Sequence, residues 1–351
     1  MTRSQNNPWL HRFALLTAAA TLFLIWVGGL VTSHGVGLSV PDWPTTYGYN
    51  MFFFPVSRWV GGVFYEHSHR LVASGVGLLT VILAVWLWLR EERRWLRRLG
   101  CIAVIAVITQ GVLGGLRVTQ MKDVLGVFHA TLAQMFLALL CAIALFTSRW
   151  WRETSRQKMA VYGSGSIRYV FALVTGMILL QLILGAAMRH QHAGLSIPDF
   201  PLAYGKWWPA MDAGSISRYN QMRGETTAAN PITSFQVGLQ MIHRIVALAI
   251  LFSAAWAAGR AWRECRGTAL SRGANGWFLL ILAQAFLGAL TIWTNKAADI
   301  ATAHVALGAL SLATGVMLSI LARQFVRAGE VEIALNPARP ANAPAANRVL
   351  A

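Results

Sequence analysis

Four histidines form two pairs whose spacing could bring two iron ligands together. His69 and His129 are 60 residues apart, and His243 and His304 are 61 residues apart. Each separation matches one down-and-back pair of helices, so both members of a pair are expected at a similar depth. Imidazole is the common axial ligand of haem iron, and the cores of four-helix bundles are natural cofactor sites. We therefore predict one haem between each pair.

The competing interpretation of these residues is that they are packing histidines. A single histidine inside an apolar helix is often hydrogen-bonded and structural. Four in duplicated register favour ligation, and two histidines are too few for a closed structural zinc site. The remaining histidines are expected in termini or outer loops with surface roles: His11, His34, His67, His190 and His192.

An internal duplication makes the two pairs comparable. Four segments recur in the same order: 37–48 as 194–205, 66–73 as 240–247, 110–116 as 284–290, and 127–133 as 302–308. This order predicts two units of four helices in parallel arrangement, each presenting the same ends to the same side.

One difference between the halves concerns a titratable group. Glu66 stands three residues before His69, whereas the counterpart before His243 is Gln240. A carboxylate can relay protons or act as a general base, and an amide cannot titrate. We therefore predict the reactive site in the first half and a permanent cofactor in the second. The alternative is a carboxylate that merely ends a helix at the aqueous surface or favours its positive N-terminus.

Arginines and glycines surround the histidine positions. Arg70 and Arg244 each follow a histidine, and Arg117 and Arg189 lie near outer helix ends, where they could pair with haem propionates. Interfacial snorkelling is the rival explanation for these arginines. The glycines would admit close helix approach or a flat macrocycle, with plain helix packing in lipid as the rival: Gly28, Gly29, Gly75, Gly77, Gly111, Gly114, Gly115, Gly185 and Gly288.

The elements that must position these residues are membrane-spanning helices. The 351 residues are 56% hydrophobic and 12% charged, which excludes an ordinary soluble domain. A spanning helix needs about 20 mostly apolar residues. Eight such stretches occur, at roughly 13–33, 67–89, 99–118, 124–147, 168–189, 240–259, 276–294 and 300–323. The predicted fold class is an all-α integral membrane protein, with eight transmembrane helices as two repeated four-helix bundles.

The basic charge fits a membrane topology. A net charge of +17 could indicate nucleic acid, but the basic residues gather in short connections between apolar stretches, so no nucleic-acid partner is expected. The connections after the second, fourth and sixth spans are the strongly basic ones. The positive-inside rule therefore places both termini on the cytoplasmic side of a bacterial cell (inner) membrane.

The combined motifs resemble those of the haem A synthase family. The resemblance rests on GLSVPDWP at 37–44, the E-x-x-H-R stretch from Glu66 to Arg70, the later His243–Arg244, and the two remaining helix histidines. It covers all eight spans, about residues 13–323.

The resemblance implies an activity and an assignment of residues. The family oxidises a ring methyl of haem O to a formyl group, giving haem A for aa3-type oxidases. His69 and His129 would bind the haem O substrate, and His243 and His304 would bind a haem b cofactor. The family's essential glutamate falls on Glu66. Haem O synthase and oxidase-assembly factors are the implied protein partners, beside the membrane lipid.

Three regions are expected along the chain. Residues 1–158 form the N-terminal half with the substrate haem site, and 159–328 form the C-terminal half with the haem b site. The tail at 329–351 is rich in Ala, Pro and Asn and is predicted to be disordered on the cytoplasmic side.

The sequence departs from the family in its cysteines. Many members carry a cysteine pair in the first outer loop, where this chain has Val40 and Thr45–Thr46. Its three cysteines lack metal-type spacing and are expected to be packing or loop thiols: Cys101, Cys141 and Cys265. The alternatives to an enzyme are a bis-histidine cytochrome b-like electron carrier and a haem transporter.

Overall fold

The computed structural model describes residues 7–156, 161–163, 165–223 and 231–328. Within these ranges eight helices are long and apolar enough to cross a membrane, which confirms the predicted number of spans. The first four are α1 (Pro8–Ser33), α2 (Gly61–Arg90), α3 (Arg94–Gln120) and α4 (Asp123–Thr147). The second four are α6 (Ile167–His190), α8 (Ser234–Glu264), α9 (Ala269–Trp293) and α10 (Ala298–Phe325). The tail predicted to be disordered lies outside the described residues.

Five helices begin five to seven residues before the apolar stretches that predicted them: α1, α2, α3, α8 and α9. α2 begins at Gly61 and α8 at Ser234, each six residues earlier than expected. The start of α8 is a capping box, in which Gln236 N donates to Thr233 Oγ1 at 3.3 Å and Thr233 N donates to Gln236 Oε1 at 2.9 Å. Hydropathy marks the apolar part of a helix, whereas its first turn is set by such local bonds. The earlier start of α2 places Glu66 inside the helix.

Each set of four helices forms a square bundle. In the first bundle α1 and α3 each pack against both α2 and α4; in the second, α6 and α9 each pack against both α8 and α10. The histidine-bearing helices α2 and α4 therefore occupy diagonal corners, and α8 and α10 do so in the other bundle.

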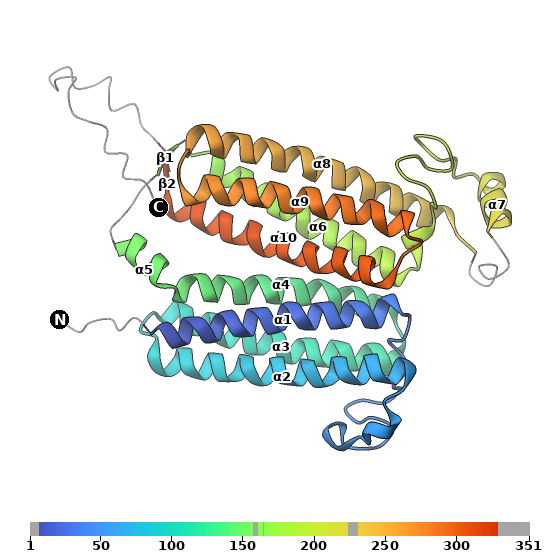
Figure 1. Ribbon diagram of the computed structural model, residues 1–351, viewed down its shortest axis with the longest axis horizontal. Coiled ribbons are helices and arrows are strands. Elements are labelled where there is room, and N and C mark those ends of the chain that lie inside the picture. Colours follow the sequence, from blue (N-terminus) through green and yellow to red (C-terminus); the bar gives the residue numbers. More distant parts are fainter. Residues whose placement is uncertain (1–6, 157–160, 164, 224–230, 329–351) are drawn as a thin grey trace.

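The two bundles lie side by side with their helices roughly parallel (Figure 1). α4 packs against α10, α1 against α10, and α4 against α6. Since α4 and α10 are the fourth helices of their halves and α1 and α6 the first, these contacts are reciprocal. An approximate two-fold relation along the helix direction produces this arrangement, which is that of a parallel duplication. The predicted fold class is confirmed.

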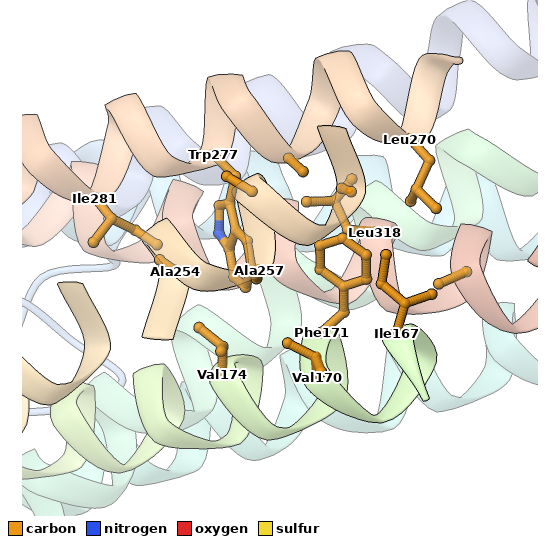
Figure 2. Packing of buried hydrophobic residues seen from close by; sticks show 14 of the residues in the cluster. Ile167, Val170, Phe171, Val174, Ala254, Ala257, Leu270, Trp277, Ile281 and Leu318 are labelled. Atoms are coloured by element: carbon orange, nitrogen blue, oxygen red, sulfur yellow. The ribbon is translucent and has the colours of Figure 1, made fainter. Parts of the chain in front are cut away.

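Each bundle has a tightly packed apolar core near the end opposite the long loops. In the second bundle Phe171 and Trp277 are fully buried with ring centroids 6.1 Å apart, and neighbouring aliphatic side chains surround them (Figure 2). The indole Nε1 of Trp277 donates to Ser311 O at 2.8 Å, which satisfies its buried polar atom. Leu83, Leu140 and other buried residues form the core of the first bundle.

The long loops gather at one end of the bundles and the basic connections at the other (Figure 1). The loop end carries η1 (Met51–Phe53), η2 (Val56–Arg58), η3 (Ala193–Leu195) and α7 (Ala213–Met222). The opposite end carries α5 (Arg149–Arg156) and a short parallel pair of strands, β1 (Val161–Gly163) and β2 (Val326–Ala328). The sequence does not predict this pair, because three residues are too few for a periodic signal.

Glu91 ties the connection between α2 and α3 to α5. Its side chain is buried and accepts from Arg93 Nε at 2.8 Å and from Arg152 Nη2 at 2.9 Å. Burial opposes the charge, but the hydrogen bonds from Arg93 outweigh it and hold the pKa of Glu91 below its usual value. Because the folded-state pKa is depressed, this stabilisation is fully present above the unfolded-state pKa and is lost as the pH falls through the folded-state value.

Glu91→Gln is expected to lower the free energy of unfolding near neutral pH by roughly 3 kcal/mol, because it removes the buried carboxylate that accepts from Arg93 and Arg152. The matched control is Glu153→Gln, which breaks the exposed pair with Arg149 and should cost less than about 1 kcal/mol. Thermal unfolding of the detergent-solubilised protein measures both. Equal losses in the two variants would contradict the prediction, and the gap should narrow as the pH is lowered.

Candidate functional site

The two histidine pairs occupy matched positions at the loop end of the bundles. His69 is the ninth residue of α2 and His129 the seventh of α4. His243 is the tenth residue of α8 and His304 the seventh of α10. All four helices begin at the loop end, so the members of each pair share a similar depth, as their spacing predicts.

The members of each pair come from helices at diagonal corners of one bundle, and each ring packs against one of the helices between those corners. The largest buried core of the second bundle lies farther inward: on α8 it begins at Ile250, beyond His243, whereas Val237 and Met241 belong to a separate buried cluster at the loop end.

Every one of the four rings lies against a glycine of an adjacent helix. A Cβ built on that glycine would approach the histidine Cε1 to between 2.9 and 3.3 Å. The four glycine–histidine contacts are Gly28 with His69, Gly114 with His129, Gly185 with His243, and Gly288 with His304. Each of these glycines therefore leaves room for an imidazole ring between two helices. This role is more specific than the general helix packing that was the alternative explanation for the glycines.

Gly28→Ala is expected to displace His69, because the new Cβ would lie 2.9 Å from the ring Cε1. The matched control is Gly75→Ala in α2, where a Cβ meets nothing within 4 Å and where alanine should favour the helix by about 1 kcal/mol. Absorption spectroscopy of added haem should show weaker binding, roughly tenfold or more, in Gly28→Ala only. Equal binding in both variants would show that the ring contact is unimportant.

The polar atoms of these rings are arranged as in candidate iron ligands. Within the described ranges, Nδ1 of His69, His129 and His243 is buried without a hydrogen-bond partner, while each residue as a whole remains partly exposed. His304 Nδ1 lies 3.0 Å from the carbonyl oxygen of Gln284, a contact that would fix the tautomer and leave Nε2 for a metal. No cluster of three or more metal-ligating side chains occurs among the residues searched. Paired histidines and their glycine contacts fit haem better than a bare ion.

Glu66 is buried at the top of the first bundle and holds the first outer loop. Its Oε2 accepts from Val40 N at 2.9 Å, and its Oε1 accepts from Arg70 Nη2 at 2.8 Å. Arg70 also donates to the carbonyl oxygens of Asp42, Thr45 and Val40 at 2.7 to 2.9 Å. The carboxylate thus lies in the helix, as expected, but it is buried in a network and does not end at an aqueous surface.

The second bundle repeats this network with an amide in place of the acid. Gln240 Oε1 accepts from Ile197 N at 2.7 Å, as Glu66 does from Val40 N. Arg244 donates to the carbonyl oxygens of Asp199 and Leu202 at 2.7 and 2.9 Å. Holding the loop therefore requires an acceptor at this position but not a charge.

The turn inside each loop is also repeated. In the first loop the carboxylate of Asp42 accepts from Tyr47 N and Gly48 N, and in the second Asp199 accepts from Tyr204 N and Gly205 N. Burial opposes the charge of Asp42, but the hydrogen bonds from Gly48, Thr45 and Tyr47 outweigh it and lower the pKa of this side chain. The repeated P-D-x-P segment is thus a structural turn over the histidine pair.

His67 contradicts its predicted surface role. Its side chain is fully buried, its Nδ1 lies 3.2 Å from Thr46 Oγ1, and its ring packs against Phe54 and Trp59. In the second half the counterpart is Met241, within an apolar cluster. The sequence signal that could have found it is its place inside E-H-S-H, one residue after a buried acid.

His190 is also buried rather than at the surface. It ends α6, and its ring lies against Gly126 of α4, at the junction of the two bundles. The sequence did not indicate this role, because His190 lies far from both histidine pairs along the chain. His34 and His192 are exposed, as expected, and His11 Nδ1 lies 3.0 Å from Ala144 O at the opposite end.

The four arginines that were predicted to contact haem propionates have different partners in the structure. Arg70 and Arg244 donate to loop carbonyls, as described above. Arg189 donates to Gly29 O at 2.7 Å and to Ser33 Oγ, which joins α6 to α1. The guanidinium of Arg117 lies against Gly37 of the first outer loop and acts electrostatically on both His69 and His129.

Lys296 adds a cation that the sequence did not single out. It lies in the turn between α9 and α10. Burial lowers the pKa of Lys296, and the nearby charge of Arg189 lowers it further. The loop end at the junction of the bundles is therefore strongly basic.

The fold and the site define a polytopic membrane protein with a paired-histidine centre in each of two duplicated bundles. Comparison with known proteins agrees with this class. The chain belongs to the family described as cytochrome oxidase assembly protein (COX15-CtaA), which matches residues 54–316.

Relatives of known name cover most of the chain. It is 27% identical over 303 residues to the Heme A synthase of Alkalihalophilus pseudofirmus, which covers 84% of this chain and 91% of that protein. It is also 27% identical over 332 residues to the Heme A synthase of Lysinibacillus sphaericus, which covers 91% of this chain and 97% of that protein. The resemblance inferred from the motifs is confirmed at the level of the family.

Proposed function

We propose that this chain is a haem A synthase, which oxidises a ring methyl of haem O to a formyl group and supplies haem A to aa3-type oxidases. The observation that carries the proposal is the repeated site. Each half brings two histidines together from diagonal helices, with every ring against a glycine, in a chain whose relatives are named Heme A synthase.

The two halves have different roles in this proposal. His69 and His129 hold the haem O substrate, and His243 and His304 hold a resident haem b. When bound, haem supplies the electron-transfer and oxygen chemistry. The difference between Glu66 and Gln240 supports this assignment, because only the first network contains a group that can exchange a proton.

The reaction makes defined demands on the first half. Two successive oxygenations of the methyl carbon give a hydrated aldehyde, and loss of water from it leaves the formyl group. Glu66 takes up and releases protons beside the substrate, one helical turn from His69. Arg70 keeps the carboxylate in position through their 2.8 Å contact. The first outer loop is held to α2 through Glu66 and Arg70.

Arg117 is the strongest of the four candidates for a propionate contact. Arg70 and Arg244 already bind several loop carbonyls, and Arg189 bridges two helices. The guanidinium of Arg117 lies against Gly37 of the first outer loop, and a guanidinium suits a carboxylate geometrically.

The remaining features of the proposal concern location and partners. The eight spans lie in the bacterial cell membrane, with both termini and the basic connections in the cytoplasm. The substrate half ends near residue 158 and the cofactor half near 328. Haem O synthase and oxidase-assembly factors are the expected protein partners.

Pigment analysis after co-expression with a source of haem O tests the function. Haem A in the extract supports the synthase. Haems B and O alone, with the protein folded and loaded, would overturn it in favour of a cytochrome b-like carrier or a haem transporter. The membrane of a strain without its own synthase is the appropriate background, because any haem A then comes from this chain.

A further inference from the structure

A glutamine accompanies three of the four glycine–histidine contacts. In α3, α6 and α9 it stands four residues, one helical turn, before the glycine: Gln110 before Gly114, Gln181 before Gly185, and Gln284 before Gly288. In α1 the corresponding residue before Gly28 is Leu24. The offset of 157 residues that relates the two outer loops also aligns Leu24 with Gln181 and Gly28 with Gly185. The duplication thus pairs a leucine with a glutamine.

The side chains of two of these glutamines donate to the backbone carbonyl of a paired histidine on the neighbouring helix. Gln181 Nε2 donates to the carbonyl oxygen of His243 at 2.9 Å, and Gln110 Nε2 donates to that of His129 at 3.0 Å. Each bond crosses from one helix to its neighbour at the residue that carries the ring. It therefore fixes the separation of the helices at that point.

The third glutamine is joined to the histidine of the neighbouring helix through its own backbone carbonyl. His304 Nδ1 lies 3.0 Å from the carbonyl oxygen of Gln284. Both histidines of the second half are therefore tied to an adjacent helix. In the first half His129 is tied, but the residue one turn before Gly28 in α1 is Leu24, whose side chain has no group to donate.

We infer that Gln181 and Leu24 are positioning residues that set how readily the two equivalent histidines move. Gln181 holds His243 in place for a permanent ligand, and Leu24 leaves His69 able to swing aside while a haem enters or leaves the first bundle. The inference rests on the proposed function, because it takes His69 and His243 as iron ligands.

The expected size of the effect follows from one hydrogen bond. A bond between transmembrane helices contributes modestly, because the separated helices find other partners. Gaining or losing one should change the rate of ligand release by roughly three- to tenfold. Leucine and glutamine are similar in length, so each can replace the other with little change in packing volume.

Reciprocal substitutions test the inference on the full-length protein in detergent. Gln181→Leu should raise the rate at which the reduced second-half haem binds carbon monoxide roughly three- to tenfold, because a histidine must leave first. This variant is purified from cells without haem O. Leu24→Gln should slow the transfer of bound haem O to excess apomyoglobin by the same factor.

The two swaps control for each other. A general loosening of helix packing would speed ligand release in both variants, whereas the inference requires opposite signs. Rates that are unchanged, or that move in the same direction, in protein that does bind haem would overturn the inference alone. A wild-type protein that binds no haem in either bundle would overturn the proposed function and this inference with it.

Discussion

Glu66→Gln should leave the resident haem bound while it lowers haem A formation about 100-fold or more, the usual contribution of a positioned acid–base group. The substitution removes the titratable group and its ion pair with Arg70 but keeps an acceptor oxygen at this position. The measurement is the ratio of haem A to haem O in pigment extracts, together with the spectrum of the resident haem.

The second half shows why the loop should survive this change. Gln240 Oε1 accepts from Ile197 N at 2.7 Å, so an amide can serve where Glu66 accepts from Val40 N. Arg70 would lose its ion pair but keep three loop carbonyls, much as Arg244 is held by two. The variant therefore tests the charge of Glu66 while it keeps the acceptor that holds the outer loop.

Two further variants complete the comparison. Gln240→Glu places an acid in the cofactor half and should not affect product formation strongly, because the acid is then beside the wrong haem. Glu66→Ala removes both the charge and the acceptor for Val40 N, so it should also loosen the first outer loop. Undiminished haem A in Glu66→Gln would exclude the proton-transfer role and leave Glu66 as a loop anchor.

The sequence predicts the architecture well because lipid restricts the choices. A spanning segment must satisfy its backbone hydrogen bonds internally, so each long apolar stretch becomes a helix. The duplication then determines which helices are equivalent. The histidine pairs follow from the same logic, since residues about 60 apart return to one end of a helical hairpin.

The sequence predicts the outer loops and helix junctions poorly, because their contacts join distant segments through single hydrogen bonds. Nothing local indicates that Glu66 would bind Val40 N across 26 residues, or that Arg189 of α6 would reach Gly29 of α1. The burial of His67 depends on the folding of the loop that supplies Phe54 and Trp59. Such partners become visible only in three dimensions.

Comparison of the halves recovers part of what local patterns miss. Where the duplicated scaffold is identical, as in the Asp42 and Asp199 turns, the residues serve the fold. Where it differs, as at Glu66 and Gln240, the change marks a difference in chemistry. In a duplicated protein, each half can therefore serve as a reference for the other.

His243→Ala and His69→Ala should have separable effects, and this contrast tests the assignment of the two halves. His243→Ala removes a ligand of the resident haem, so the haem content of purified protein should fall at least about tenfold, and product should fall with it. His69→Ala should leave the resident haem and its spectrum intact while haem A formation is lost. The exposed His192 provides the control, because His192→Ala alters a histidine outside both pairs.

The strength of this contrast comes from the separation of the two pairs into different bundles. The two largest buried clusters consist mainly of residues from one bundle each, with Ala309 of α10 joining the first, so removal of one ring should disturb the other half little. If His69→Ala removed the resident haem and His243→Ala spared it, the roles of the halves would be reversed. Loss of all haem in both variants would instead mean that the two sites bind haem cooperatively, since α4 and α10 pack directly against each other and each carries one of the proposed ligands.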